Sequence, residues 1–281
     1  MQPFFYGYEM LELNRNRIYV KDGGVSTALR KACAGSGCEI CELLNVKNPL
    51  AVEKLHQDYV AFGADIITTN TFGTIQLPET QQYEICFEGA KLACKVADLF
   101  AREVLVAGSI GVFPDQPNYL RKYQIQAEAL CEGGADFIFI ESIWDLALAK
   151  TVVEANVEIV RNYKKRIAFS ITVGEDTQAE FVEKFVSEFE IYNPLFLGIN
   201  CSNEPESIVK FANRLSELTD TPLLIAPNAG IPDANGNCPL KPERFLDEMK
   251  PLIDSGKFSI IGGCCGTTPA HIKLINDYIR S

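Results

Sequence analysis

The sequence predicts a (β/α)8 TIM barrel, an α/β fold in a single domain of 281 residues. One pattern recurs eight times: a short β-branched or aromatic run, a polar tip and an amphipathic segment. Most of these runs are continuously apolar, as expected for strands of a parallel sheet buried on both faces. The hydrophobic content of 47% and the length suit one barrel-sized core, and no stretch resembles a linker.

The predicted strands are residues 18–22, 65–70, 104–109, 136–141, 166–172, 194–201, 222–228 and 258–264. Helical periodicity appears between them, at 49–62, 146–160 and 179–189, and Gly63 is placed to end the first of these helices. Gly-Ala-Asp precedes two strands, at 63–65 and 134–136, which indicates one helix-to-strand turn used twice. A doubly wound open sheet is the alternative. It ranks second because no G-x-G-x-x-G follows the first strand.

Charge and composition limit the classes of molecule that the protein is expected to bind. The net charge of −11 disfavours nucleic acid, and no segment approaches the length of a membrane span. Residues 1–17 are expected to form an N-terminal extension of the barrel domain 1–281. They lack a basic region, and Glu9 and Glu12 interrupt their apolar stretch, so a signal peptide is not expected. These observations predict a cytoplasmic protein whose ten cysteines are reduced.

Polar side chains collect where the predicted strands end, which in a barrel is the working face. The residues at these tips are Asp22, Thr69, Asn70, Ser109, Glu141, Thr172, Asn200, Cys201, Asn228, Cys264 and Cys265. Loops that begin at strand ends explain a serine or a threonine there. They explain poorly three cysteines at the ends of the sixth and eighth strands.

Three thiolates suit a catalytic zinc site, which keeps its fourth position open. Gly262, Gly263 and Gly266 would let the chain turn so that Cys264 and Cys265 both reach one metal ion. An open position would accept a substrate thiol and favour its thiolate, a sulfur nucleophile at neutral pH. From spacing alone, a vicinal pair that only packs, with an unrelated buried Cys201, is an equal alternative.

Several motifs together resemble the homocysteine S-methyltransferase family. They are GGCCGTTPAHI at 262–272, GINCS at 198–202, PNAG at 227–230, DGG at 22–24, GADIITTNTFG at 63–73 and EGGADFIFIES at 132–142. The resemblance spans residues 18–275. It implies a (β/α)8 barrel in which a zinc ion on Cys201, Cys264 and Cys265 activates the thiol of homocysteine as a zinc thiolate, which is methylated to methionine.

The resemblance also implies the substrate contacts. Asp22 and Glu141 are expected to hold the amino group by charge-assisted hydrogen bonds. The turn at Gly23, Gly24 and Ser26 is expected to offer backbone N–H groups to the carboxylate. Asn70, at the end of the second strand, is a further substrate-binding candidate. Asn228 is expected near the metal, at its fourth position before substrate arrives.

The methyl donor is less determined by the sequence. Residues 227–236 most resemble the homocysteine half of cobalamin-dependent methionine synthase. Because no corrinoid-binding domain is recognised, a methyl-corrinoid on a separate protein is the expected donor. The segment 111–118 is shorter than the loop of family members, which leaves S-methylmethionine, S-adenosylmethionine or betaine as alternatives. A non-catalytic zinc- and homocysteine-binding subunit is an alternative of another class.

Other signals are weaker. An aldolase would need a Schiff-base lysine at a strand tip, where Lys21 lies, or a phosphate grip after strands seven and eight. Cys33, Cys38 and Cys41 have the spacing C-x4-C-x2-C of plant-type iron–sulfur proteins. A cluster would need a fourth ligand, so ordinary loop cysteines are expected, with a redox-sensitive or second metal site as the alternative. The remaining predictions are core positions for Cys86, Cys94 and Cys131, a structural or exposed His56, a first-turn His271, and a pocket or packing role for Trp144.

Overall fold

The computed structural model describes residues 10–33, 40–114, 119–174, 176–202, 205–231 and 238–281. Eight parallel strands form one sheet in the order β1-β8-β7-β6-β5-β4-β3-β2. Their bounds are β1 Tyr19–Val20, β2 Ile66–Thr68, β3 Leu105–Gly111, β4 Phe137–Ile143, β5 Arg166–Ile171, β6 Leu197–Asn200, β7 Leu223–Ala226 and β8 Ile260–Ile261. A parallel bridge between Lys21 and Ile66 joins the two ends, with the Asp22 N–H donating to Ile66 O at 2.9 Å. The predicted barrel is confirmed, and the open doubly wound sheet is wrong.

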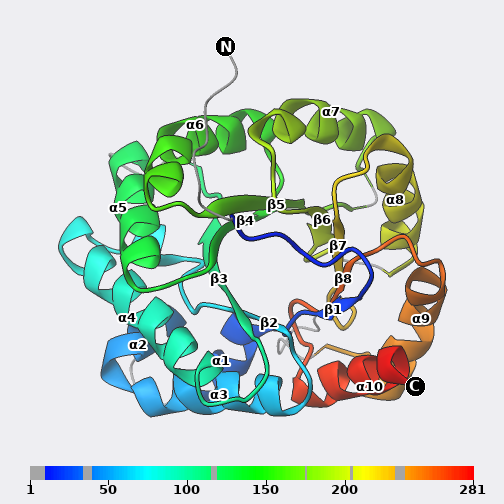
Figure 1. Ribbon diagram of the computed structural model, residues 1–281, viewed down its shortest axis with the longest axis horizontal. Coiled ribbons are helices and arrows are strands. Elements are labelled where there is room, and N and C mark those ends of the chain that lie inside the picture. Colours follow the sequence, from blue (N-terminus) through cyan, green and yellow to red (C-terminus); the bar gives the residue numbers. More distant parts are fainter. Residues whose placement is uncertain (1–9, 34–39, 115–118, 175, 203–204, 232–237) are drawn as a thin grey trace.

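Helices follow every strand and form a ring outside the sheet (Figure 1). They are α1 Val25–Cys33, α2 Leu44–Lys47, α3 Pro49–Ala61, α4 Glu79–Ala97, α5 Tyr119–Glu132, α6 Leu146–Asn162, α7 Ala179–Phe189, α8 Pro205–Leu218, α9 Pro242–Asp254 and α10 Pro269–Arg280, with single 3-10 turns at Cys41–Leu43, Thr74–Gln76 and Glu190–Tyr192. Among the described residues, no helix combines the length and apolarity that a bilayer crossing requires.

The fourth strand differs from its predicted bounds. We expected it to end at Glu141, but β4 continues to Ile143, which pairs with Ile171 of β5. The register shifts between Ile140 and Ile143, and Ser142 has a left-handed φ of 58°. Such a bulge turns side chains away from the regular alternation. It lets Glu141 face the barrel mouth while the strand remains paired.

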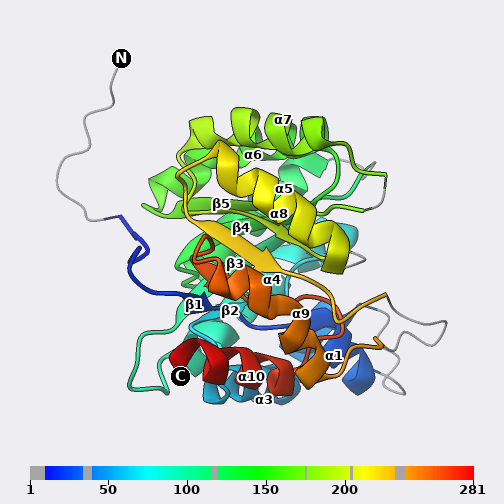
Figure 2. The same ribbon diagram turned by 90° about the vertical axis from the view of Figure 1, so that its right-hand side faces the viewer.

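Two apolar layers hold the barrel together. Inside it, Phe137 and Phe139 of β4 pack edge-on against Phe196, with ring centroids 5.6 and 5.2 Å apart. A larger layer fills the space between the strands and the ring of helices. Leu13 joins the inner layer, so the segment before β1 covers the amino-terminal end of the barrel (Figure 2). The opposite end is therefore the accessible mouth.

The repeated Gly-Ala-Asp turn is confirmed. Gly63 and Gly134 have φ values of 106° and 103°, a region that glycine occupies without a steric penalty. After each, an aspartate accepts a backbone N–H from the preceding strand. The Val20 N–H donates to Asp65 Oδ2 at 2.9 Å, and the Val106 N–H donates to Asp136 Oδ2 at 2.7 Å. The same side-chain bond therefore ties neighbouring strands at two places.

His56 of α3 is fully buried, and neither ring nitrogen has a hydrogen-bond partner among the residues that the structure describes. Burial lowers the pKa of His56 to about 4 from its usual 6.5, although the charge of Asp22 opposes the shift. The unfolded chain therefore binds a proton that the folded chain excludes. His56 thus stabilises the fold fully above pH 6.5, and that contribution disappears as the pH falls toward 4.

We expect acidification across this window to cost about 3 kcal/mol of unfolding free energy through His56, since each pKa unit corresponds to about 1.4 kcal/mol. The measurement is urea unfolding of the wild type and of His56→Leu at a series of pH values. The difference between the two should change by that amount between pH 6.5 and 4. A difference that is independent of pH would show that folding does not lower the pKa of His56.

Candidate active site

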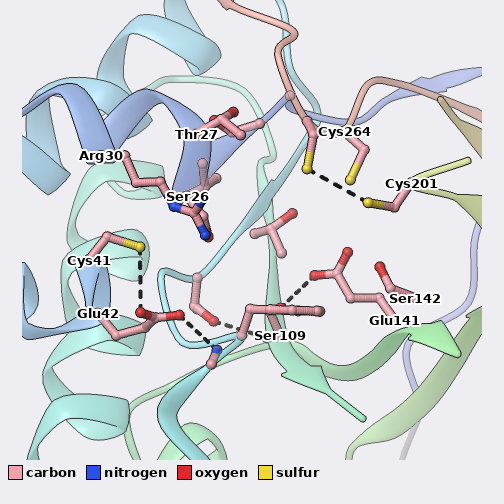
Figure 3. A pocket seen from close by; sticks show the side chains of 18 of the residues that line it. Ser26, Thr27, Arg30, Cys41, Glu42, Ser109, Glu141, Ser142, Cys201 and Cys264 are labelled. Atoms are coloured by element: carbon pink, nitrogen blue, oxygen red, sulfur yellow. Dashed lines mark hydrogen bonds between the residues drawn. The ribbon is translucent and has the colours of Figure 1, made fainter. Parts of the chain in front are cut away.

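A cavity of about 310 Å³ opens at the carboxyl ends of the strands (Figure 3). Its lining residues come from the ends of six strands and the loops that follow them, from α1, and from the segment after α1. They are Lys21, Gly23, Gly24, Val25, Ser26, Thr27, Arg30, Ile40, Cys41, Glu42, Thr68, Thr69, Phe72, Gly73, Gln76, Ser109, Phe113, Glu141, Ser142, Cys201, Cys264 and Cys265. The polar strand ends therefore converge, as the barrel predicts.

The three cysteines at the ends of β6 and β8 meet at one side of this cavity (Figure 3). The sulfur atoms of Cys201, Cys264 and Cys265 all lie within 4.8 Å of one another, and those of Cys201 and Cys265 are 3.7 Å apart. In the described part of the chain, this is the group of three ligand-type side chains close enough to share a metal ion. Cys201 has a left-handed φ of 51°, a strained conformation typical of functional positions.

Backbone contacts fix the adjacent pair. The Cys264 N–H donates to Pro227 O at 2.8 Å, and the Ala229 N–H donates to Cys265 O at 2.9 Å, so the loop after β7 holds the loop after β8. Two of the glycines expected to let the chain turn have different roles. Gly266 has a left-handed φ of 78°, which suits a turn. At Gly262 a Cβ would lie 2.7 Å from Cβ of Lys21, so this glycine is required for close packing rather than for a turn.

The three thiols share their protons unequally. Hydrogen bonds from Cys201 and Cys264 lower the pKa of Cys265 to about 4. Hydrogen bonding to Cys264 raises the pKa of Cys201 above its usual value. Hydrogen bonding within the cluster therefore favours the thiolate of Cys265, and a cation placed among the sulfur atoms would stabilise the other two as thiolates.

Glu141 lies across the cavity mouth from the helix α1 (Figure 3). Its Oε1 accepts a hydrogen bond from Ser109 Oγ at 2.5 Å, and its Oε2 accepts one from Asn200 Nδ2 at 3.0 Å. The Asn200 amide also approaches Cys264 Sγ at 3.8 Å. Burial raises the pKa of Glu141 to about 7, although the charge of Lys21 opposes the shift. This carboxylate is thus oriented within reach of the thiol cluster.

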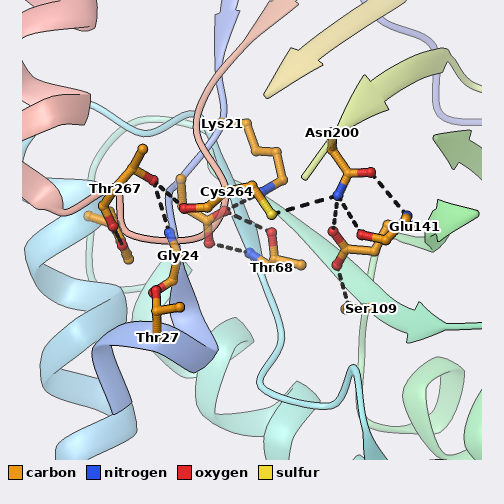
Figure 4. Close-up of polar contacts among 12 residues, drawn as sticks. Lys21, Gly24, Thr27, Thr68, Ser109, Glu141, Asn200, Cys264 and Thr267 are labelled. Atoms are coloured by element: carbon orange, nitrogen blue, oxygen red, sulfur yellow. Dashed lines mark hydrogen bonds and ion pairs between the residues drawn. The ribbon is translucent and has the colours of Figure 1, made fainter. Parts of the chain in front are cut away.

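Asp22 occupies a different position from Glu141. It is completely buried, and Lys21 lines the cavity while Asp22 does not. The Lys21 Nζ atom lies 2.8 Å from Asp22 Oδ1 (Figure 4). Burial lowers the pKa of Lys21, but the charges of Asp22, Glu141 and Cys264 outweigh burial and leave this pKa above its usual value. Lys21 is therefore a protonated cation, which is not the neutral amine that a Schiff-base aldolase needs.

The turn after β1 leads directly into α1. Gly24 uses its N–H internally, donating to Thr267 at Oγ1 and at the carbonyl oxygen. The cavity instead meets the first turn of α1, at Val25, Ser26 and Thr27, and the exposed Arg30 one turn later. Helix amino termini attract anions because their first N–H groups lack partners within the helix. Gly23 and Gly24 also line the cavity, so the turn and the start of α1 lie side by side on its wall.

The two predicted asparagines lie outside the cavity lining. Asn70 donates from Nδ2 to Cys41 O at 2.9 Å and to Asn45 Oδ1 at 3.0 Å, so it fixes the segment before α2. Asn228 is buried, and its Oδ1 has no hydrogen-bond partner in the described structure. It stands between Pro227 and Ala229, the two residues bonded to the cysteine pair.

Most of the weaker signals are structural. Cys86 and Cys131 are buried and Cys94 is partly buried, as expected. Cys33 and Cys41 are buried, whereas Cys38 lies outside the described residues. His271, in the first turn of α10, joins a capping box with Thr268. Trp144 is 50% exposed at the mouth, where its Nε1 donates to Val112 O at 3.3 Å.

The fold and the site define a barrel enzyme whose thiol cluster and buried carboxylates face one small cavity. The homocysteine S-methyltransferase family model matches residues 19–279, so the chain belongs to that family, whose members transfer a methyl group to the thiol of homocysteine.

Solved structures of similar fold support membership of this family. The homocysteine methyltransferase MmuM from Escherichia coli in its apo form is 26% identical, with a TM-score of 0.73 over 92% of this chain and 95% of that one. Its metallated form is 24% identical, with a TM-score of 0.73 over 94% and 96%. The carboxyl transferase domain of Rhizobium etli pyruvate carboxylase, 11% identical, shares the fold alone, with a TM-score of 0.55 over 93% of this chain and 46% of that one.

Proposed function

We propose that the chain is a zinc-dependent homocysteine methyltransferase whose metal ligands are Cys201, Cys264 and Cys265. The observation that supports this most is the gathering of three sulfur atoms within 4.8 Å at the cavity wall. The donor set suits zinc because soft thiolates favour it over hard cations. The unpartnered Oδ1 of the buried Asn228 supplies an oxygen of the kind that could complete a tetrahedral set. Bound zinc would lower the pKa of a substrate thiol and so favour its thiolate.

The cavity offers homocysteine a partner for each charge. Glu141 would accept hydrogen bonds from the amino group on the side near Asn200 and Cys264. The first turn of α1 and the Arg30 guanidinium would receive the carboxylate on the opposite wall. With both ends held, the sulfur atom points toward the three cysteines. Orientation of this kind lowers the barrier by removing the entropy cost of alignment.

The residues at the mouth favour an apolar approach for the donor. Phe72 and Phe113 line the cavity with ring centroids 5.3 Å apart, and the half-exposed Trp144 bonds to Val112, the residue before Phe113. We propose a methyl-corrinoid carried by a separate protein as the donor, because a large flat cofactor would cover such a rim. The methyl carbon would form its bond to sulfur as its bond to the donor breaks, and the thiol proton would pass to solvent.

The test combines metal analysis with two titrations of anaerobically purified protein. We expect about one zinc ion per chain, proton release when homocysteine binds, and methionine formation with methylcobalamin. Methionine formed only with S-methylmethionine, S-adenosylmethionine or betaine would reject the corrinoid donor while keeping the zinc mechanism. Metal-free protein that ignores homocysteine would contradict the mechanism itself. Homocysteine binding without turnover on any donor would indicate a binding subunit.

A further inference from the structure

Lys21 is a cation built into the substrate cavity. It is only 4% exposed, it follows β1 directly, and it lines the cavity opposite α1. Figure 4 shows its side chain beside Cys264, and its Nζ atom forms an ion pair with Asp22. The Lys21 ammonium thus occupies the site beside the Asp22 carboxylate. Without Lys21, the amino group of a substrate would be expected to bind there.

Asp22 has no need of a further partner. Its Oδ2 accepts the Thr68 N–H at 2.6 Å, and its Oδ1 accepts Thr68 Oγ1 at 2.7 Å and Lys21 Nζ at 2.8 Å. The carboxylate is completely buried behind these contacts. A substrate amino group would have to displace Lys21 to reach it, and the displaced ammonium would then be left unpaired in a buried site.

Glu141 is also partnered within the protein, by Ser109 and by Asn200. This arrangement matters for specificity. A site whose buried polar groups depend on a substrate group rejects an analogue that lacks the group by about 10⁴-fold or more, because those polar groups are left unpaired. Here both carboxylates keep hydrogen-bonded partners when no substrate amino group is present. The usual cost of omitting that group is therefore absent.

We propose that the cavity also accepts thiol carboxylic acids that lack the α-amino group, of which 4-mercaptobutyrate matches homocysteine in length, and that Lys21 determines this breadth. Such a substrate brings no second ammonium beside Lys21, so it avoids a like-charge contact in a buried site. Its carboxylate still meets the first turn of α1, next to Arg30.

The reaction would be the one proposed for homocysteine, on which this inference rests. The thiol proton passes to solvent, sulfur forms a bond to the methyl carbon, and the bonding electron pair of that carbon leaves with the donor. The product is an S-methyl thioether acid.

The test is calorimetric binding of homocysteine and 4-mercaptobutyrate to the metal-loaded wild type, Lys21→Met and Lys122→Met. We expect homocysteine to bind the wild type no more than about 100-fold more tightly than 4-mercaptobutyrate, the value of its one bond to Glu141 and far from the 10⁴-fold gap of an amino-dependent site. In Lys21→Met the free Asp22 carboxylate should shift the ratio toward homocysteine by at least about tenfold, a gain typical of one added charge-assisted bond. Lys122→Met is the matched control, because Lys122 is a buried lysine of α5 that donates to Ile75 O outside the cavity.

The outcomes separate this inference from the proposed function. Homocysteine that binds more than about 10³-fold more tightly than 4-mercaptobutyrate to the wild type would overturn the inference alone. A ratio unchanged in Lys21→Met, or in Lys21→Gln if the first variant does not fold, would overturn the role of Lys21. If neither thiol binds the wild type, the proposed function fails and the inference fails with it.

Discussion

Replacing Cys264 with alanine is expected to remove the bound metal and, with it, proton release on homocysteine binding. The variant keeps two of the three sulfur atoms that lie within 4.8 Å of one another, too few to hold zinc with a fourth position for substrate. We expect turnover to fall more than about 100-fold, because loss of a ligand exceeds the 10–100-fold loss typical of its outer partners. Metal content per chain and methionine formation measure the two effects.

Cys238→Ala is the matched control for that experiment. Its Sγ lies 3.9 Å from Cys265 O, so it is a nearby half-buried thiol outside the group of three. We expect this variant to keep its metal. Normal zinc content in Cys264→Ala, or equal loss in both variants, would show that the three-cysteine assignment is wrong.

Asp65→Asn is expected to cause the largest loss of stability. The Asp65 carboxylate lies 2.8, 3.2 and 2.8 Å from guanidinium nitrogens of Arg17, Arg102 and Arg280. These arginines come from the segment before β1, the loop after α4 and the end of α10, so one side chain ties three distant parts of the chain. We expect a loss of about 3 kcal/mol, the lower end for a broken buried pair, because the arginines are more than a third exposed and partly screened.

Asp136→Asn is the control that distinguishes the contribution of the three arginines from that of the Gly-Ala-Asp turn. Asp136 follows the second Gly-Ala-Asp turn and accepts the same kind of backbone bond, and the described residues include no arginine bonded to it. We expect a loss of about 1 kcal/mol in urea unfolding, the net value of one hydrogen bond. The difference between the two variants should shrink in high salt, since partly exposed pairs are screened. Equal losses would mean that the arginines contribute nothing.

Much of the fold followed from the sequence because local pattern and global architecture agree. Runs such as 136–141 are apolar throughout, which distinguishes a doubly buried strand from a surface one, and α7 spans the predicted residues 179–189. The end of β4 was missed because a bulge at Ser142 depends on pairing with β5, which no local pattern encodes.

The candidate site also has features that the sequence predicts and features that it does not. That Cys201, Cys264, Cys265 and Glu141 face one cavity follows from their places at strand ends, since parallel strands in a barrel deliver their carboxyl ends to one mouth. The partners of those residues could not be predicted. Asn228 and Asn70 also stand at strand ends, yet they lie outside the cavity lining, because side-chain direction depends on the packed neighbours.

The sequence by itself determined the class of fold, the family and the identity of the thiol cluster, because periodicity and motif spacing are local properties of the chain. Only the tertiary structure decided that Lys21 pairs with Asp22 and lines the cavity, and that the start of α1 lines it beside the glycine turn. The physical reason is that a charge needs a partner only when the fold buries it. Lys21 and Asp22 are neighbours in the sequence, but barrel closure buries them and brings the Thr68 N–H and hydroxyl to Asp22.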